Sequence, residues 1–208
     1  MENVKDSYKN WSKVYDTNEN RTRDLDLNIS KEILSKISFE SVLEIGCGTG
    51  KNTLWLSEIA KSLIAVDFSP EMIQIAKRKV NIDHVQFMEA DISKPWKFNS
   101  SLVDLISINL VLEHIENLDL IFDNAATNLK TNGFLFISEL HPFKQYLGSQ
   151  AKYENQLVKS HIHHISDYFK LANKYNFKCE ELVESFDDIP KKSEENIPRL
   201  ISLLFKKN

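Results

Sequence analysis

The stretch Val42-Leu43-Glu44-Ile45-Gly46-Cys47-Gly48-Thr49-Gly50 holds three of the five glycines of this 208-residue chain. It begins with a short apolar run and precedes a helix-like segment. Glycine adopts backbone conformations closed to other residues and lets a ligand approach the main chain, so this cluster predicts a loop that binds a nucleotide cofactor. A dinucleotide fingerprint would read G-x-G-x-x-G. Here the third glycine comes one residue early, and Lys51 stands in its place.

The acidic residue before the loop helps to choose among nucleotide cofactors. Glu44 would repel a pyrophosphate, whereas it would attract the ammonium and sulfonium groups of S-adenosylmethionine. A nicotinamide oxidoreductase would share the strand, loop and helix, and competition between NAD and S-adenosylhomocysteine would separate the two interpretations. The electrostatics favour the cationic ligand.

At this point the chain resembles the class I S-adenosylmethionine-dependent methyltransferases, whose first motif is an acidic residue followed by G-x-G-x-G. Asp67 ends a second apolar run, where the resemblance implies a clamp on the ribose diol. Asp91 follows a third strand-like run and by resemblance would bind the adenine amino group. Segments 103–109 and 129–138 resemble the fourth strand of the family and its helix end, glycine turn and fifth strand. The matches occur in the order of the family.

The resemblance implies a set of cofactor contacts in the glycine loop, after the next three strands and in the N-terminal segment: Glu44, Gly46, Cys47, Gly48, Gly50, Asp67, Phe68, Met72, Asp91, Ile92, Asn109, Tyr15 and Arg23. Asp67 and Asp91 could instead cap helices, the commoner role of a single Asp after a strand. Cys47 is expected to fill a small position with an unactivated thiol. Arg23 could pair with the methionyl carboxylate of the cofactor or with acidic surface residues.

Composition and element order predict one globular domain, with 42% hydrophobic and 27% charged residues. Strands and helices alternate from residue 42 to 138, which predicts a parallel sheet with helices on both faces. The resemblance adds a doubly wound α/β fold of seven strands with the last strand antiparallel. The expected parts are an N-terminal helical lid (1–38), a cofactor-binding core (41–139), a substrate-side insertion (140–164) and a C-terminal helix and strand pair (165–208).

The N-terminal segment carries apolar and aromatic residues at helical spacing, namely Val4, Tyr8, Trp11 and Tyr15. This face either packs on the body of the domain or forms a lid over the active site. A second helix is expected over residues 28–37.

Ligands of open parallel sheets bind beyond the carboxyl ends of the strands, so the acceptor should lie between the first helix and the insertion. The candidate substrate contacts there are Trp11, Tyr15, His114, His141, Tyr146 and His163. His114 and His141 follow the fourth and fifth strands and are the candidate catalytic residues, because an alcohol, phenol or ammonium acceptor must lose a proton. Each could instead be a polar wall or a structural hydrogen-bond donor.

Other classes of function find less support in the sequence. The histidines near residue 161 do not complete a familiar ligand spacing, so no metal is expected. The net charge of −4, and the absence after Asn109 of the Pro-Pro-aromatic motif of base-methylating enzymes, argue against a nucleic-acid acceptor. The polar start resembles neither a signal peptide nor a membrane span, so a cytoplasmic monomer or homodimer is expected.

The expected function is therefore methyl transfer from S-adenosylmethionine to the oxygen or nitrogen of a small molecule, with S-adenosylhomocysteine as product. Two alternatives remain open. One is a protein acceptor, and the other is a catalytically silent cofactor-binding subunit that stabilises a partner.

Overall fold

The computed structural model describes residues 20–98, 101–149, 152–153, 156–157, 159–186 and 197–208. The helices and strands of the described residues, in chain order, are α2 (Arg21–Leu34), β1 (Ser41–Ile45), α3 (Lys51–Ile59), β2 (Ser62–Asp67), α4 (Pro70–Lys79), β3 (Val85–Glu89), β4 (Val103–Asn109), the 3₁₀ helix η1 (Leu112–His114), α5 (Asp119–Asn128), β5 (Leu129–Leu140), α6 (Pro142–Tyr146), β6 (Lys152–Tyr153), β7 (Gln156–Leu157), α7 (Ile165–Lys174), β8 (Phe177–Ser185) and β9 (Leu200–Lys207).

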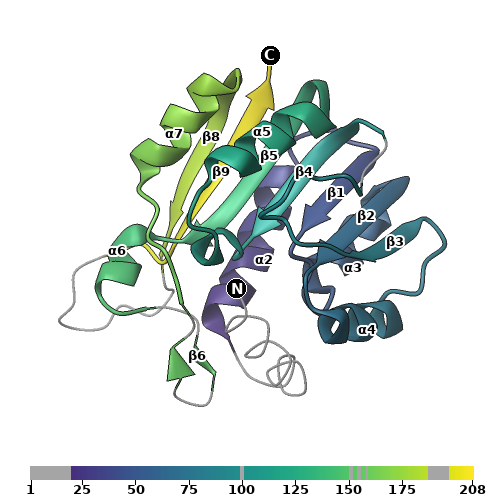
Figure 1. The fold of residues 1–208 in the computed structure, drawn as a ribbon, viewed down its shortest axis with the longest axis horizontal. Helices are drawn as coiled ribbons and strands as arrows, with labels where there is room; N and C mark the ends of the chain where they lie inside the picture. The colour runs from purple at the N-terminus through teal and green to yellow at the C-terminus, as the bar shows by residue number, and fades with distance from the viewer. Residues whose placement is uncertain (1–19, 99–100, 150–151, 154–155, 158, 187–196) are drawn as a thin grey trace.

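Seven strands form one sheet in the order β3-β2-β1-β4-β5-β9-β8 (Figure 1). The strands from β3 to β5 pair in parallel, and β9 is antiparallel to both of its neighbours. The expected doubly wound α/β sheet with an antiparallel last strand is confirmed. The strand order reverses between β1 and β4, and a crevice opens beyond the carboxyl ends of parallel strands at such a switch point.

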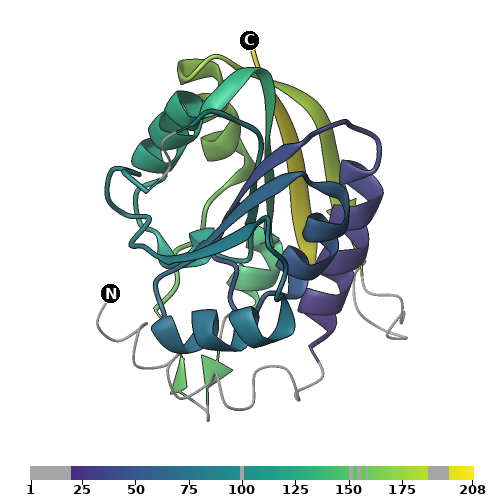
Figure 2. The same ribbon diagram turned by 90° about the vertical axis from the view of Figure 1, so that its right-hand side faces the viewer.

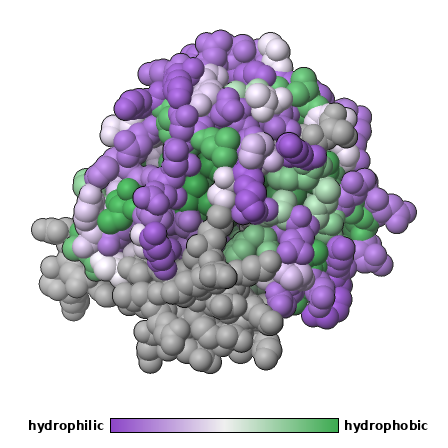
Figure 3. All heavy atoms as spheres, viewed as in Figure 1, coloured by the Kyte–Doolittle hydropathy of each residue, from purple (hydrophilic) through white to green (hydrophobic). Residues whose placement is uncertain are grey.

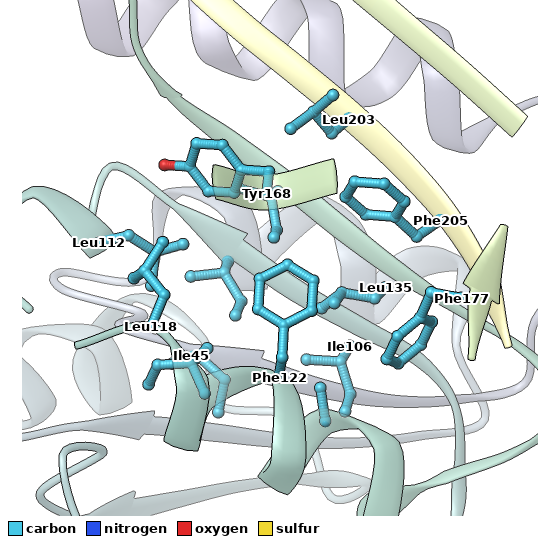
Figure 4. Close-up of a cluster of buried hydrophobic side chains, with 14 of the residues drawn as sticks. Ile45, Ile106, Leu112, Leu118, Phe122, Leu135, Tyr168, Phe177, Leu203 and Phe205 are labelled. Carbon is cyan, nitrogen blue, oxygen red and sulfur yellow. The ribbon is translucent and has the colours of Figure 1, made fainter. Parts of the chain in front are cut away.

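Helices cover the two faces of the sheet, with α2 and α3 on one side and α5 and α7 on the other (Figure 2). Side chains of β5 alternate between the two sides, as the pleat of a strand requires. On the α5 side, Phe122 meets Phe177 and Phe205 edge to face, and Leu112 and Tyr168 reach the same cluster (Figure 4). These packed layers hold the strand ends in place.

The helix α2 differs from the expectation in both of its ends. It begins at Arg21 rather than at residue 28, because the Asn20 side chain caps it by accepting the Arg23 N–H at 3.1 Å. It ends at Leu34 rather than at residue 37. Residues 21–26 therefore lie within this helix, although the second helix was expected to begin only at residue 28. Asp26 lies on the buried face of a helix instead.

Two connections shape the edge of the sheet where ligands are expected. Between β3 and β4, none of the described residues is helical. After β5, α6 begins almost at once and leaves Phe143, Tyr146 and Leu147 more than half exposed, and Figure 3 shows hydrophobic side chains at the surface in this region. The predicted lid helix with Trp11 and Tyr15 lies outside the described residues. In the part of the chain that the structure describes, no helix has the length and apolar composition to cross a bilayer.

Candidate cofactor and acceptor site

The glycine loop connects the end of β1 to α3 in a conformation that suits glycine. Gly46 and Gly48 have φ angles of 73° and 52°, in the left-handed region. The N–H groups of Gly46 and Cys47 both donate to the carbonyl of Val66, at 2.8 and 3.0 Å. The loop is thereby tied to the end of β2, and α3 begins directly after it.

Asp67, the last residue of β2, joins the glycine loop to the start of α4. Its Oδ2 accepts the Gly48 N–H at 2.9 Å, and its Oδ1 accepts the Ser69 N–H at 2.9 Å. Ser69 itself caps α4 by accepting the Met72 N–H at 3.3 Å. Burial raises the pKa of Asp67 to about 6, although the backbone hydrogen bonds counteract it. The carboxylate as a whole retains the capacity to accept a further hydrogen bond.

Glu44 and Asp26 lie buried close to this loop. The Glu44 Oε2 accepts the Thr53 hydroxyl at 2.6 Å. Burial raises the pKa of Glu44 to about 7, and the carboxyl groups of Asp67 and Asp26 add to the effect. The Asp26 carboxylate accepts the side-chain amide of Asn109 at 2.8 Å, and burial raises its pKa as well. A cationic ligand placed here would stabilise the ionised forms of these groups.

A hollow opens beyond the ends of the parallel strands. It is lined by Gly46, Asp67, Phe68, Ala90, Asp91, Ile92, Val111, His114 and Ile115. Its walls are mostly apolar, and two carboxyl groups lie at separate points on its border. This arrangement suits a flat apolar ring that carries polar groups on its edges.

Asp91 is held in a tight turn. It accepts the Ser93 N–H at 3.1 Å and the Ser93 hydroxyl at 2.6 Å, and it pairs with Lys94 at 3.1 Å. Burial acts to raise the pKa of Asp91, but the Ser93 hydrogen bonds and Lys94 outweigh it and keep the pKa below its ordinary value. Asp91 is therefore an ionised hydrogen-bond acceptor at the border of the hollow.

His114 lies on η1 between this hollow and a second, more polar one. The second hollow is lined by Ser93, His114, Ile115, Glu116, Asn117, Leu120, Lys159 and His161. The His114 Nδ1 lies 3.3 Å from the Lys159 carbonyl, which can only accept, so Nδ1 carries the hydrogen. Burial lowers the pKa of His114. In the neutral ring, Nε2 is then the basic nitrogen.

His141 has a different environment. Its ring is fully buried, its Nδ1 accepts the Phe143 N–H at 3.2 Å, and its Nε2 lies 3.0 Å from the Glu184 carboxylate. His141 thus caps α6 and lines neither hollow. This placement fits the structural alternative for His141 rather than the role of a base.

The other expected contacts take varied positions. Cys47 and Met72 are buried, and burial raises the pKa of the Cys47 thiol well above its ordinary value. The Tyr146 hydroxyl lies 3.0 Å from the His164 ring. Arg23 lies in the first turn of α2, one turn before Asp26. Trp11 and Tyr15 lie outside the described residues.

Comparisons with known proteins identify the family of this chain. The model of a family described as "Methyltransferase domain" matches residues 17–182. The chain belongs to this methyltransferase family. The methyltransferase is 31% identical to malonyl-[acyl-carrier protein] O-methyltransferase of Bacillus cereus over 140 residues. These residues make up 62% of this chain and 51% of that protein. It is also 32% identical to phosphoethanolamine N-methyltransferase 1 of Arabidopsis thaliana over 131 residues. These residues make up 58% of this chain and 26% of that protein.

A solved structure shares the fold of this methyltransferase. The N-methyltransferase NodS of Bradyrhizobium japonicum WM9, in complex with S-adenosyl-l-homocysteine, superposes with a TM-score of 0.74 at 19% identity, covering 99% of this chain and 98% of that one. The chain spans between 26% and 60% of the length of the first five curated relatives that it matches.

Sequence reasoning missed two buried acids of the methyltransferase. Asp26 was expected to precede the second helix, and the cap at Asn20 was the signal that could have placed it on that helix. Glu139 interrupts an apolar strand run, and such an acid needs partners when it is buried. Among the described residues, no three or more His, Cys, Asp or Glu side chains converge in a way that could hold a metal ion.

Proposed function

We propose that this methyltransferase binds S-adenosylmethionine in the hollow beyond β1 to β4 and transfers its methyl group to the oxygen or nitrogen of a small molecule. The observation that carries the proposal is the position of Asp67, which bonds to the glycine loop and borders an apolar hollow that also reaches Asp91. The names of the relatives add support, because they include an O-methyltransferase and an N-methyltransferase.

The residues present fit this cofactor. The ribose hydroxyls would donate to Asp67, and the adenine ring would contact Phe68 and Ile92 with its amino group donating to Asp91. The buried carboxyl group of Glu44 favours the cationic ammonium and sulfonium groups. The methionyl carboxylate would pair with Arg23 at the start of α2.

Some of the expected contacts act indirectly in this proposal. Cys47, Gly50 and Met72 hold the loop and the start of α4, and Asn109 holds the buried Asp26. Tyr15 of the N-terminal segment remains a proposed contact, as do the substrate contacts Trp11 and Tyr146.

The bound cofactor supplies a methyl group on a positively charged sulfur, ready for in-line displacement. The chain then has to align the acceptor, exclude water and take up a proton where the acceptor carries one. His114 is placed for the last task, because it is neutral, its Nε2 is basic and its ring borders both hollows. A carboxylate acceptor would not need this base.

Calorimetric titration with S-adenosylhomocysteine tests the cofactor site. Asp67→Ala should weaken binding by about tenfold to a hundredfold, because it removes an acceptor of hydrogen bonds to the ribose. NAD should not compete. Unchanged affinity in a folded Asp67→Ala variant would overturn the placement. A metabolite extract incubated with methyl-labelled cofactor, followed by identification of the labelled product, would then identify the acceptor. Labelled protein instead of a labelled metabolite would favour the protein-acceptor alternative.

A further inference from the structure

The loop from residue 110 to 115 forms one wall of the cofactor hollow and presses on the glycine loop. Val111, His114 and Ile115 line the hollow. Val111 also packs tightly on Gly46, since a Cβ at position 46 would lie only 2.1 Å from the Val111 Cγ2. Leu110 starts the loop with a φ of 55°, which is uncommon for a residue with a side chain. Such a loop needs strong hydrogen bonds to keep its shape.

Glu139 holds this loop from the sheet side. Its Oε1 accepts the N–H groups of Val111 and Leu112 at 2.9 and 2.8 Å. The side chain is buried, and its Oε2 has no hydrogen-bond partner among the described residues. Two successive backbone donors therefore converge on one carboxyl oxygen of Glu139, which fixes the direction in which the loop leaves β4.

His163 also holds this loop, through backbone carbonyls of the loop. Its Nε2 lies 3.1 Å from the Leu112 carbonyl and 2.7 Å from the Ile115 carbonyl, so Nε2 carries a hydrogen that both oxygens share. A backbone hydrogen bond adds to these two contacts, because the N–H of His161, two residues before His163, donates to the Glu113 carbonyl at 2.7 Å. The His163 ring packs edge-on against Tyr168 of α7.

We propose that Glu139 and His163 are positioning residues that clamp the 110–115 loop against the glycine loop and so build one wall of the cofactor pocket. The inference rests on the proposed placement of the cofactor. It gives His163 a role different from substrate contact, and it gives Glu139 a role that the sequence did not suggest. Because His163 lies one residue before the end of the insertion of residues 140–164, the clamp also links the acceptor side of the enzyme to the cofactor wall.

Four variants test the clamp. Glu139→Leu and His163→Leu remove the acceptor and the donor, and each should weaken S-adenosylhomocysteine binding by about tenfold or more. Glu139→Gln keeps an oxygen that can accept both N–H groups, and His163→Gln keeps an N–H near the same position. Each of these should stay within about threefold of the unmodified affinity. Hydrogen exchange of a peptide covering residues 109–116 should be faster in the two leucine variants alone.

The chain offers matched controls elsewhere in the fold. The Asp104 Oδ2 also accepts two successive N–H groups, from Glu40 and Ser41 at 3.1 and 2.9 Å. The His84 Nε2 also bonds a backbone carbonyl, that of Ser57 at 2.9 Å. Asp104→Leu and His84→Leu should lower stability without changing the affinity of the folded protein for S-adenosylhomocysteine or the exchange of residues 109–116.

The outcomes separate the clamp from the cofactor placement. If Asp67→Ala loses affinity while folded Glu139→Leu and His163→Leu bind normally, the cofactor placement stands and the clamp is wrong. If the glutamine variants lose as much affinity as the leucine variants, the hydrogen bonds do not explain the effect and the clamp is also wrong. If Asp67→Ala binds normally, the placement fails and the clamp inference fails with it. Should a leucine variant not fold, its glutamine counterpart still tests the clamp, because a loss of affinity greater than about threefold in that folded variant would overturn it.

Discussion

Replacing Gly46 with alanine should destabilise this methyltransferase by about 2–5 kcal/mol, the sum of two separate costs. A φ of 73° costs an L-residue about 1–2 kcal/mol. The added Cβ would also lie 2.1 Å from the Val111 Cγ2, against about 3.5–4.0 Å for an ordinary carbon contact. The valine must therefore move, and overpacking of this kind costs about 1–3 kcal/mol.

Urea unfolding of two further variants separates these costs. Gly48→Ala has a φ of 52° but no atom within 4 Å of the new Cβ, so it should lose only the backbone cost. Val111→Ala removes the methyl group that collides, so the double variant Gly46→Ala/Val111→Ala should be more stable than the two single losses predict. Any loss of S-adenosylhomocysteine binding that the displaced Val111 side chain causes in Gly46→Ala should be recovered in the same double variant.

Equal destabilisation by Gly46→Ala and Gly48→Ala would refute this reasoning. Strict additivity of Gly46→Ala and Val111→Ala would do the same, because it would mean that the two side chains do not meet. Displacement of the Val111 side chain would then not explain any loss of cofactor binding in Gly46→Ala.

Three further predictions concern pH and the N-terminal segment. Burial raises the pKa of Glu139 to about 8, with Glu113 and Asp26 adding to the effect. Between about pH 5 and pH 8 the folded state therefore keeps a proton that the unfolded state releases. The free energy of unfolding should accordingly fall as pH rises from about 5 to 9. Denaturant titrations at several pH values should show a smaller fall in Glu139→Gln. The ribose hydroxyls donate to the ionised form of Asp67, whose pKa is about 6. Calorimetry should therefore find weaker binding of S-adenosylhomocysteine as pH drops below about 6. This pH dependence should be absent in Asp67→Asn. Removal of residues 1–18 should reduce turnover more than stability; normal turnover, together with equal hydrogen exchange of residues 4–16 with and without S-adenosylhomocysteine, would contradict the lid.

The sheet could be predicted from local patterns and the family resemblance. Strand-like runs alternate with helices from residue 42 to 138, and this alternation permits few arrangements besides a parallel sheet. The start of α2 was missed although Asn20 can cap a helix, because Asp24 and Asp26 look like loop residues in the sequence. Asn20 lacks the Glu or Gln three residues later that would have marked a capping box.

The candidate site was predictable where one short motif carries the chemistry. The glycine loop, Asp67 and Asp91 lie together at the border of one hollow, as the motif order implied. The roles of the histidines were not predictable, because they depend on contacts distant in sequence. His141 meets Glu184 of β8, and His163 meets the carbonyls of the loop after β4. Spacing within a segment carries no information about such partners.

The buried acids at this edge of the sheet share one physical consequence. Glu44, Asp67, Asp26 and Glu139 all have a pKa raised by burial, so each resists ionisation in the protein without a ligand. A ligand with cationic groups and hydroxyl donors favours the ionised forms of Glu44 and Asp67, which means that its binding should release protons near neutral pH. The buried acids Glu44 and Asp67, whose ionisation lowers the stability of the folded protein at high pH, thus also favour S-adenosylmethionine over an anionic dinucleotide.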